Sequence, residues 1–136
     1  QNISFNTNIA KNIPNLYGNQ NQFEQVFINL IQNSIDAVSN NDKSKKIICE
    51  IKRSKKAGNV IIEFSDNGHG INSEDFKKIF EAFYTTKEKN KGTGLGLTII
   101  NRIIKRHKGE IKLSKSGIFT TFIIELPIKN SKIKNT

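Results

Sequence analysis

The chain has 136 residues, enough for one domain with a single core, and a formal net charge of +10. Its lysines lie in predicted turns, strand ends and the C-terminal tail and do not alternate with aromatic residues, so a solvated surface is favoured over a nucleic-acid or membrane surface. The sequence has no apolar run of the ~18 residues that a membrane span needs, no recognisable signal peptide, and a lone cysteine, Cys49, which gives no sign of disulfides or zinc.

The first predicted elements are a strand and a long helix. Residues 3–9 alternate apolar and polar side chains with the period of a half-buried strand, and Leu16-Tyr17 favours a short second strand. A helix is expected from Asn19 or Asn21, either of which can cap it, to about Ser39. Its apolar residues have the spacing of a core-facing stripe, which comprises Phe23, Val26, Phe27, Leu30, Ile31, Ile35 and Val38.

The rest of the chain alternates pairs of strands with helical segments. Ser73 to Phe83 predicts a short helix, and a second long helix is expected from Thr93 or Gly94 to His107, with Gly109 ending it. His107 suits the C-terminal end of that helix, so we expect a structural role for it. The remaining strands are predicted as a hairpin of residues 47–52 and 60–64 and as a final pair of residues 110–113 and 119–126.

This order of elements predicts an α+β two-layer sandwich: a mixed, mostly antiparallel sheet with helices on one face. It does not fit a doubly wound dinucleotide fold. We expect residues 1–128 to form the domain and residues 129–136 to be a flexible basic tail. Because the sequence begins at Gln1 inside a strand-like pattern, without Met, we expect it to be a piece of a longer protein.

Two glycine-containing segments are the strongest candidates for a ligand site. Asp66 follows a predicted strand and precedes Gly68 and Gly70, so its carboxylate can accept a hydrogen bond from an exocyclic amine while the glycines turn tightly. The alternative for Asp66 is an ordinary Asx-turn residue. Residues 92–97 open the second long helix, where backbone N–H groups favour an anion, and Lys87, Lys89 and Lys91 add positive charge nearby. The Rossmann and P-loop patterns do not match, because no strand precedes residues 92–97 and no GxxxxGK[ST] occurs.

A third candidate lies on the first long helix. Asn29, Asn33 and Asp36 are spaced i, i+4, i+7, which places them within about 60° of each other beside the apolar stripe. Two amides and a carboxylate can bind a hard cation through oxygen and phosphates through N–H groups. The alternative is a solvated edge in an Asn-rich protein.

Together these segments resemble the catalytic and ATP-binding domain of sensor histidine kinases, in the GHKL superfamily shared with type II topoisomerases, a heat-shock chaperone and mismatch-repair proteins. The match runs in order from about residue 3 to 128: Gln25–Ser34 resembles the N box, Asp66–Ile71 the G1 box, Ile79–Tyr84 the F box, Gly92–Leu97 the G2 box, and Thr120-Thr121-Phe122 the strand that closes the adenine pocket. Residues 83–87 are similar to the lid of nitrogen-regulation and dicarboxylate sensors. Ser34, Lys108 and Phe119 depart from the usual pattern, which often has Ala, Gly and Gly there.

The resemblance implies a Bergerat-type ATP-binding fold and a role for each matching residue. Asp66 would bind the adenine amine directly and through a water shared with Thr121, and Asn33 would supply an oxygen to Mg²⁺. The backbone of residues 94–97 would hold the phosphates beneath a lid of residues 72–91, and Asn29, Asn33 and Lys87 would be the catalytic residues. The complete implied nucleotide site is Asn29, Asn33, Asp36, Asp66, Gly68, Gly70, Ile71, Ile79, Phe80, Tyr84, Lys87, Gly92, Thr93, Gly94, Leu95, Gly96, Leu97 and Thr121.

The implied function is transfer of the γ-phosphoryl group of ATP to a histidine on a separate dimerisation domain. Hydrolytic relatives have Glu where this chain has Asn29, and an amide cannot act as a general base, so transfer is favoured over hydrolysis. The competing interpretations are an ATP-gated interaction module without catalysis, an ATP-hydrolysing clamp and a serine kinase of the anti-sigma type. The implied partners are the parent protein's phosphoacceptor domain and a response regulator. We expect no nucleic acid, no direct membrane contact, and a cytoplasmic position in a membrane-anchored bacterial sensor.

Overall fold

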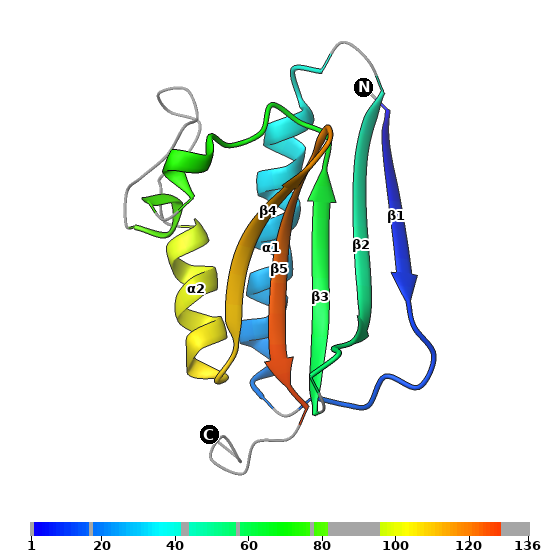
Figure 1. Cartoon of the computed structure of the whole chain (residues 1–136), viewed down its shortest axis with the longest axis vertical. Coiled ribbons are helices and arrows are strands. Elements are labelled where there is room, and N and C mark those ends of the chain that lie inside the picture. Colours follow the sequence, from blue (N-terminus) through cyan, green and yellow to red (C-terminus); the bar gives the residue numbers. More distant parts are fainter. Residues whose placement is uncertain are drawn as a thin grey trace.

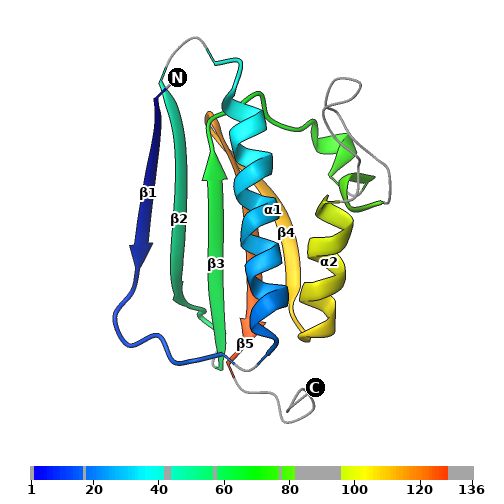
Figure 2. The ribbon, with the colours of Figure 1, turned by 180° about the vertical axis from the view of Figure 1, so that it is seen from behind.

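The computed structural model describes residues 2–16, 18–41, 44–56, 58–76, 78–81 and 96–128. Figure 1 shows one sheet with the helices gathered behind it, and Figure 2 shows both long helices lying on the same face. This is the α+β two-layer arrangement that the sequence predicts, so the predicted fold class is confirmed. No helix among the described residues is both long and apolar enough to cross a membrane.

The sheet is mixed and mostly antiparallel, also as predicted. Its order is β1-β2-β3-β5-β4, in which β1 pairs with β2 in parallel and every other neighbouring pair is antiparallel. β1 and β4 are therefore the edges. The strands are β1 (Ile3–Ile9), β2 (Lys45–Arg53), β3 (Asn59–Asp66), β4 (Glu110–Ser116) and β5 (Phe119–Pro127).

The two long helices are α1 (Gln20–Val38) and α2 (Gly96–Arg106). Asn19 caps α1 by accepting a hydrogen bond from the Gln22 N–H at 3.0 Å, so the first of the two predicted caps is confirmed. The predicted start of the second helix at residue 93 or 94 lies outside the described residues. Between the helices and the sheet lies a core of Ile, Leu, Val and Phe side chains, including Leu30, Phe64, Ile100, Ile104 and Ile124.

The chain is less buried near β1 than the sequence predicts. Phe5 and Ile9 are 43% and 65% exposed, and Ile35 on α1 is 36% exposed. Figure 2 gives the reason for the exposure of β1, because α1 and α2 lie toward the β3, β5 and β4 part of the sheet and β1 lies beyond the edge of α1. The prediction of a half-buried first strand and of a core position for Ile35 is therefore wrong.

Two further predicted elements differ from the structure. In place of one helix over residues 73–83, the described residues form two 3-10 turns, η1 (Ser73–Asp75) and η2 (Lys78–Phe80). The described residues 10–16 contain no strand, although Leu16 packs against the core; Tyr17 lies outside the described residues. Cys49 is buried, and burial raises the pKa of its thiol.

His107 joins the two long helices at one end of the molecule. Its Nε2 accepts a hydrogen bond from the Asn19 backbone N–H at 3.1 Å, which leaves Nδ1 as the protonated nitrogen that donates to the Ile103 carbonyl at 2.8 Å. The ring is 2% exposed and packs on Phe23 with the centroids 4.4 Å apart. The predicted structural role of His107 is confirmed.

Candidate functional site

Asp66 is the last residue of β3 and is almost fully buried, with 5% of its surface exposed. Its Oδ1 accepts a hydrogen bond from the Gly68 backbone N–H at 2.9 Å, and its Oδ2 accepts one from Ser34 Oγ of α1 at 3.3 Å. The first bond is the Asx turn that the sequence left open as the alternative. The second bond, to a residue 32 positions away, places the carboxylate against the buried face of α1 as well.

Opposing effects act on the charge of Asp66. Burial raises its pKa above the ordinary value, and the hydrogen bonds from Gly68 and Ser34 together with the charge of His69 lower it. An ionised carboxylate has about four acceptor positions, and these two bonds use two of them. A ligand group that donates hydrogen bonds could therefore occupy another acceptor position and stabilise the charged form of this acid.

The segment after Asp66 is held against the helix layer by close backbone contact. A side chain at Gly68 would lie 2.3 Å from the Ala37 carbonyl oxygen, so only glycine fits there, and the His69 N–H donates to the same oxygen at 3.2 Å. Asn67 fixes the other side, because its Oδ1 accepts the Lys46 N–H at 2.8 Å and its carbonyl accepts from Asn41 Nδ2 at 2.8 Å.

The strand register corrects one predicted site residue. Asp66 pairs with Thr120 across β3 and β5, and Thr120 is 4% exposed on the helix-covered face. Thr121 faces the other side of the sheet, where its hydroxyl lies 2.7 Å from Ser65 Oγ. The prediction that Asp66 and Thr121 share a water is therefore wrong, because alternate residues of a strand point to opposite faces. Thr120 is the threonine that lies on the same face as Asp66, beside Gly70, whose φ of +80° suits glycine.

The polar edge of α1 borders the start of α2. Asn29 Nδ2 donates to the Gly96 carbonyl at 3.4 Å, and Asn29 Oδ1 accepts from Gln25 Nε2 at 3.1 Å. Asn33 and Asp36 lie one and two turns further along this edge, and Asp36 Oδ1 accepts from Gln32 Nε2 at 3.1 Å. The predicted polar strip and the first described turn of α2 are thus brought together.

Several predicted site residues pack between the core and the candidate site. Ile79 is buried, and Ile71, Phe80 and Leu97 lie against the same core. Thr98 Oγ1 donates to the Phe80 carbonyl at 2.9 Å, so η2 is tied to the first turn of α2. The other predicted site residues, namely Tyr84, Lys87, Gly92, Thr93, Gly94 and Leu95, lie outside the described residues, as do Lys89, Lys91 and most of the predicted lid.

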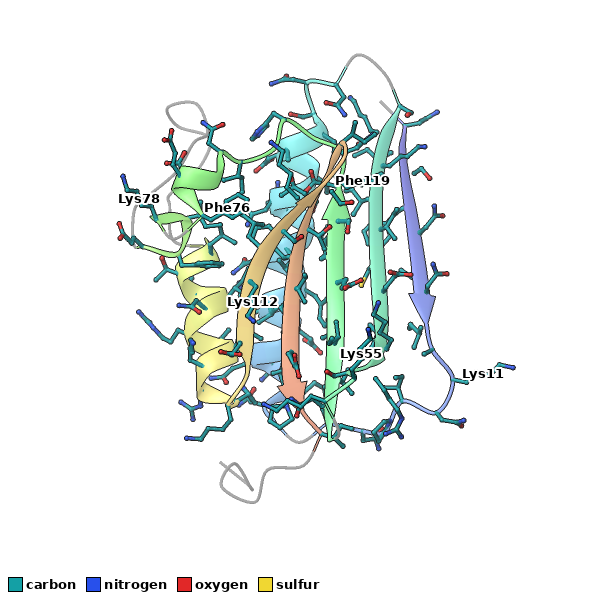
Figure 3. All side chains as sticks on the ribbon, viewed as in Figure 1. Lys11, Lys55, Phe76, Lys78, Lys112 and Phe119 are labelled. Carbon is teal, nitrogen blue, oxygen red and sulfur yellow. The ribbon has the colours of Figure 1, made fainter. Side chains whose placement is uncertain are left out.

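A separate groove of about 490 Å³ lies between the η turns, α2 and β4. Phe76, Phe80, Ile111 and Leu113 provide its apolar lining, and Lys105 and Lys112 are among its polar residues. Figure 3 shows Phe76 and Lys112 near the β4 edge of the sheet. Asp66, Ser34 and Thr120 do not line the groove, so it is distinct from the candidate site.

Sequence reasoning missed two residues that contact the acid or its turn. Thr120 could have been found from the parity of β5, because Phe122, Ile124 and Leu126 mark even positions as the core face and Glu125 marks odd positions as the outer face. The sequence distinguishes Ser34 only as a departure from the Ala that the family pattern often has there. Nothing in the local sequence indicates that its hydroxyl reaches a strand on the other side of the core.

Comparison with known proteins gives one consistent family. The model of the histidine kinase-, DNA gyrase B-, and HSP90-like ATPases matches residues 18–130. The chain is 43% identical to sporulation kinase C of Bacillus subtilis, in a match that covers 83% of this chain and 25% of that protein. It is 37% identical to sporulation kinase E of the same organism, in a match that covers 96% of this chain and 17% of that protein. It therefore spans a quarter or less of these two relatives.

Solved structures agree with this family. The catalytic domain of histidine kinase ThkA, in a nucleotide-free form, superposes with a TM-score of 0.80 at 32% identity and covers 93% of this chain and 79% of that one. A second nucleotide-free form of the same domain has a TM-score of 0.78 at 30% identity. The similarity thus extends over more than nine-tenths of this chain.

Proposed function

Because the chain belongs to the family of histidine kinase-, DNA gyrase B- and HSP90-like ATPases, with the fold of a histidine kinase catalytic domain, we propose that it is the ATP-binding catalytic domain of a sensor histidine kinase. It transfers the γ-phosphoryl group of ATP to a histidine on a separate dimerisation domain. The observation that carries the proposal is the buried Asp66 carboxylate, whose two oxygens are each held by one hydrogen bond and which lies next to Thr120 and Gly70.

Adenine recognition is assigned to Asp66. An ionised carboxylate only accepts hydrogen bonds, and the exocyclic amine of adenine donates them. Burial strengthens such a bond, because water competes less for the acceptor. Thr120 adds a hydroxyl on the same face, and the absence of a side chain at Gly70 leaves space beside that hydroxyl.

The phosphate tail is assigned to the start of α2. An added Cβ at Gly96 would meet no atom of the described residues within 4 Å, and a helix N-terminus favours negative charge. Asn29 lies beside Gly96 and can present its amide toward a phosphate. The proposed contacts of Lys87 and of residues 92–95 belong to the part of the chain outside the described residues.

The donor set of α1 fits Mg²⁺ as a partner of the phosphates. Magnesium is bound by few protein oxygens together with phosphate oxygens and water, and the described residues contain no cluster of three or more His, Cys, Asp or Glu side chains that would hold a metal alone. Asn33 would supply the amide oxygen, with Asn29 and Asp36 on the same edge. Bound there, the ion would neutralise phosphate charge, which is the main requirement of phosphoryl transfer.

The residues of this chain favour transfer over hydrolysis. Asn29 occupies the position of the general base in hydrolytic relatives, and its amide cannot take a proton from water. Neither histidine lies on a separate helical hairpin of the acceptor kind: His107 is buried with both ring nitrogens hydrogen-bonded, and His69 lies in the turn after β3. The acceptor histidine therefore belongs to another domain of the parent protein. That domain, a response regulator and a cytoplasmic position in a membrane-anchored sensor are the proposed context.

Two measurements test this function. Titration calorimetry of the whole chain with ADP tests nucleotide binding, and incubation with γ-labelled ATP, Mg²⁺ and the parent protein's acceptor domain tests transfer. We expect both to be positive. ADP binding without label transfer would favour the ATP-gated interaction module, and release of free phosphate without the acceptor would favour the hydrolytic clamp.

A further inference from the structure

We propose that Ser34 is a positioning residue that strengthens the selectivity of Asp66 for a 6-amino purine over a 6-oxo purine. This inference rests on the proposed function and deepens it, because it names a residue that strengthens base specificity at the same site. It concerns a position where the histidine kinase pattern often has Ala, so the inference is limited to what the Ser34 hydroxyl adds in this chain.

The Ser34 hydroxyl contacts the Asp66 carboxylate from the buried face of α1. Ser34 is 2% exposed, lies on the same buried stripe of α1 as Leu30 and Val38, and donates to Asp66 Oδ2 at 3.3 Å. Gly68 N–H donates to the other oxygen at 2.9 Å. One bond from α1 and one from the turn fix both the position and the plane of the carboxylate, a torsion that is otherwise broad.

A carboxylate held in this way presents only acceptors to a ligand. The exocyclic amine of adenine donates to it, whereas the 6-oxo group of hypoxanthine or guanine is itself an acceptor and would be repelled. The selectivity lasts as long as the carboxyl is charged and correctly oriented, and the Ser34 hydroxyl supports both conditions, because a hydrogen bond to the charged form stabilises that form against burial.

Without the hydroxyl, the acid would keep only the bond from Gly68 in a buried environment. The carboxyl could then rotate, and its protonated form could donate to a 6-oxo group. The other groups around it would not change: His69 is the ionisable side chain whose charge acts on Asp66, and β5 contributes the uncharged Thr120. A change in base selectivity on removing the hydroxyl would therefore report on Ser34.

The test is calorimetric titration of the whole chain with ADP and with inosine diphosphate. We expect Ser34→Ala to reduce the ratio of ADP to inosine diphosphate affinity by about 2- to 12-fold, the equivalent of one hydrogen bond. Ser34→Thr retains the hydroxyl and should restore the ratio. The matched control is Ser39→Ala, which removes another hydroxyl of the α1 region that bonds the Asp36 carbonyl and should leave the ratio unchanged.

The outcomes separate this inference from the proposed function. A wild-type chain that binds no ADP overturns the proposed function itself. A wild-type chain that binds ADP, with an unchanged ratio in Ser34→Ala or an equal loss for both nucleotides, overturns only the role of Ser34. The double variant Asp66→Asn, Ser34→Ala provides a second measurement that does not depend on Ser34→Thr. Its ratio of ADP to inosine diphosphate affinity should equal that of Asp66→Asn alone. A further change as large as that caused by Ser34→Ala in the wild type would also overturn the role of Ser34.

Discussion

The Asp66 carboxylate is proposed to bind adenine, and its burial in the charged form lowers the stability of the fold. The substitution Asp66→Asn separates these two effects. Asp66→Asn keeps the size of the side chain and can keep hydrogen bonds to Gly68 and Ser34, but it places an N–H₂ group where the adenine amine needs an acceptor. We expect ADP binding to weaken by about 1–3 kcal/mol, the range for an unpaired buried polar group. Unchanged affinity in calorimetry would remove Asp66 from the site.

The same variant should show a pH-dependent gain in stability. Burial raises the folded-state pKa of Asp66 above its ordinary value of 3.8, so between these two pKa values the folded chain keeps a proton that the unfolded chain has released. The wild type therefore loses stability relative to Asp66→Asn as the pH rises from 3.8 through the folded-state pKa. Urea unfolding below pH 4 and at pH 7 measures this, and a difference between the two proteins that is independent of pH would contradict it.

At the scale of single residues, the sequence identifies the acid but not all of its neighbours. Asp66, Gly68 and Gly70 stand out because a carboxylate and two glycines follow a strand directly. Thr120 and Thr121 are chemically equal in the sequence, and only the strand register distinguishes them. Ser34 meets Asp66 across the core, a tertiary contact that no local pattern encodes.

At the scale of elements, His107 links the two long helices at their shared end. His107→Ala would leave a cavity beside Phe23 and remove the acceptor of the Asn19 N–H and the donor to Ile103. We expect a loss of about 3–5 kcal/mol in urea unfolding, as for other large buried aromatic residues. The exposed histidine provides the control: His69→Ala should change stability by no more than about 0.5 kcal/mol. Equal effects of the two variants would show that this link is unimportant.

A second element-scale link joins the β2–β3 hairpin to β5. Glu125 accepts hydrogen bonds from Asn59 Nδ2 at 2.7 Å and from Ser54 Oγ at 3.0 Å. The bond from Asn59 is the main reason that the pKa of Glu125 lies below its ordinary value, so its contribution to stability is present above pH 4.5 and is lost as the pH falls through the lowered pKa. Glu125→Gln should therefore reduce stability at pH 7 and have less effect in acid. Thermal unfolding at both pH values checks this, with the exposed Glu110→Gln as the control.

The predicted elements succeed where a local signal is strong and fail where burial depends on neighbours. The bounds of α1 follow from its apolar stripe and its Asn cap, both local. The exposure of Phe5 and Ile9 depends on how far the helix layer reaches across the sheet, which alternation in β1 does not reveal. The 73–83 segment has helical spacing but folds as separate 3-10 turns within its described part.

For the whole molecule, ligand binding and fold stability should be coupled. A nucleotide that contacts β3, the turn after it and the start of α2 binds only the folded chain, so ADP at about 100 times its dissociation constant should stabilise the domain by about 2.7 kcal/mol. Unfolding in urea with and without ADP measures this gain. Asp66→Asn should lose much of the gain at the same ADP concentration, while Glu110→Gln should retain it.

Asn33 on the edge of α1 and Asp66 at the end of β3 should act on different parts of Mg-ATP. Because Asn33 is assigned to Mg²⁺ and Asp66 to the base, Asn33→Ala should reduce label transfer from Mg-ATP to the parent protein's acceptor domain by about tenfold or more, given that losing even an indirect metal contact costs 10- to 100-fold. Binding of ADP without Mg²⁺ should change much less. Gln32→Ala is the matched control, since it removes a neighbouring amide that bonds Asp36 Oδ1 on the exposed side. A normal transfer rate in Asn33→Ala would move the metal contact to another residue, whereas equal losses with and without Mg²⁺ would place Asn33 in nucleotide binding alone.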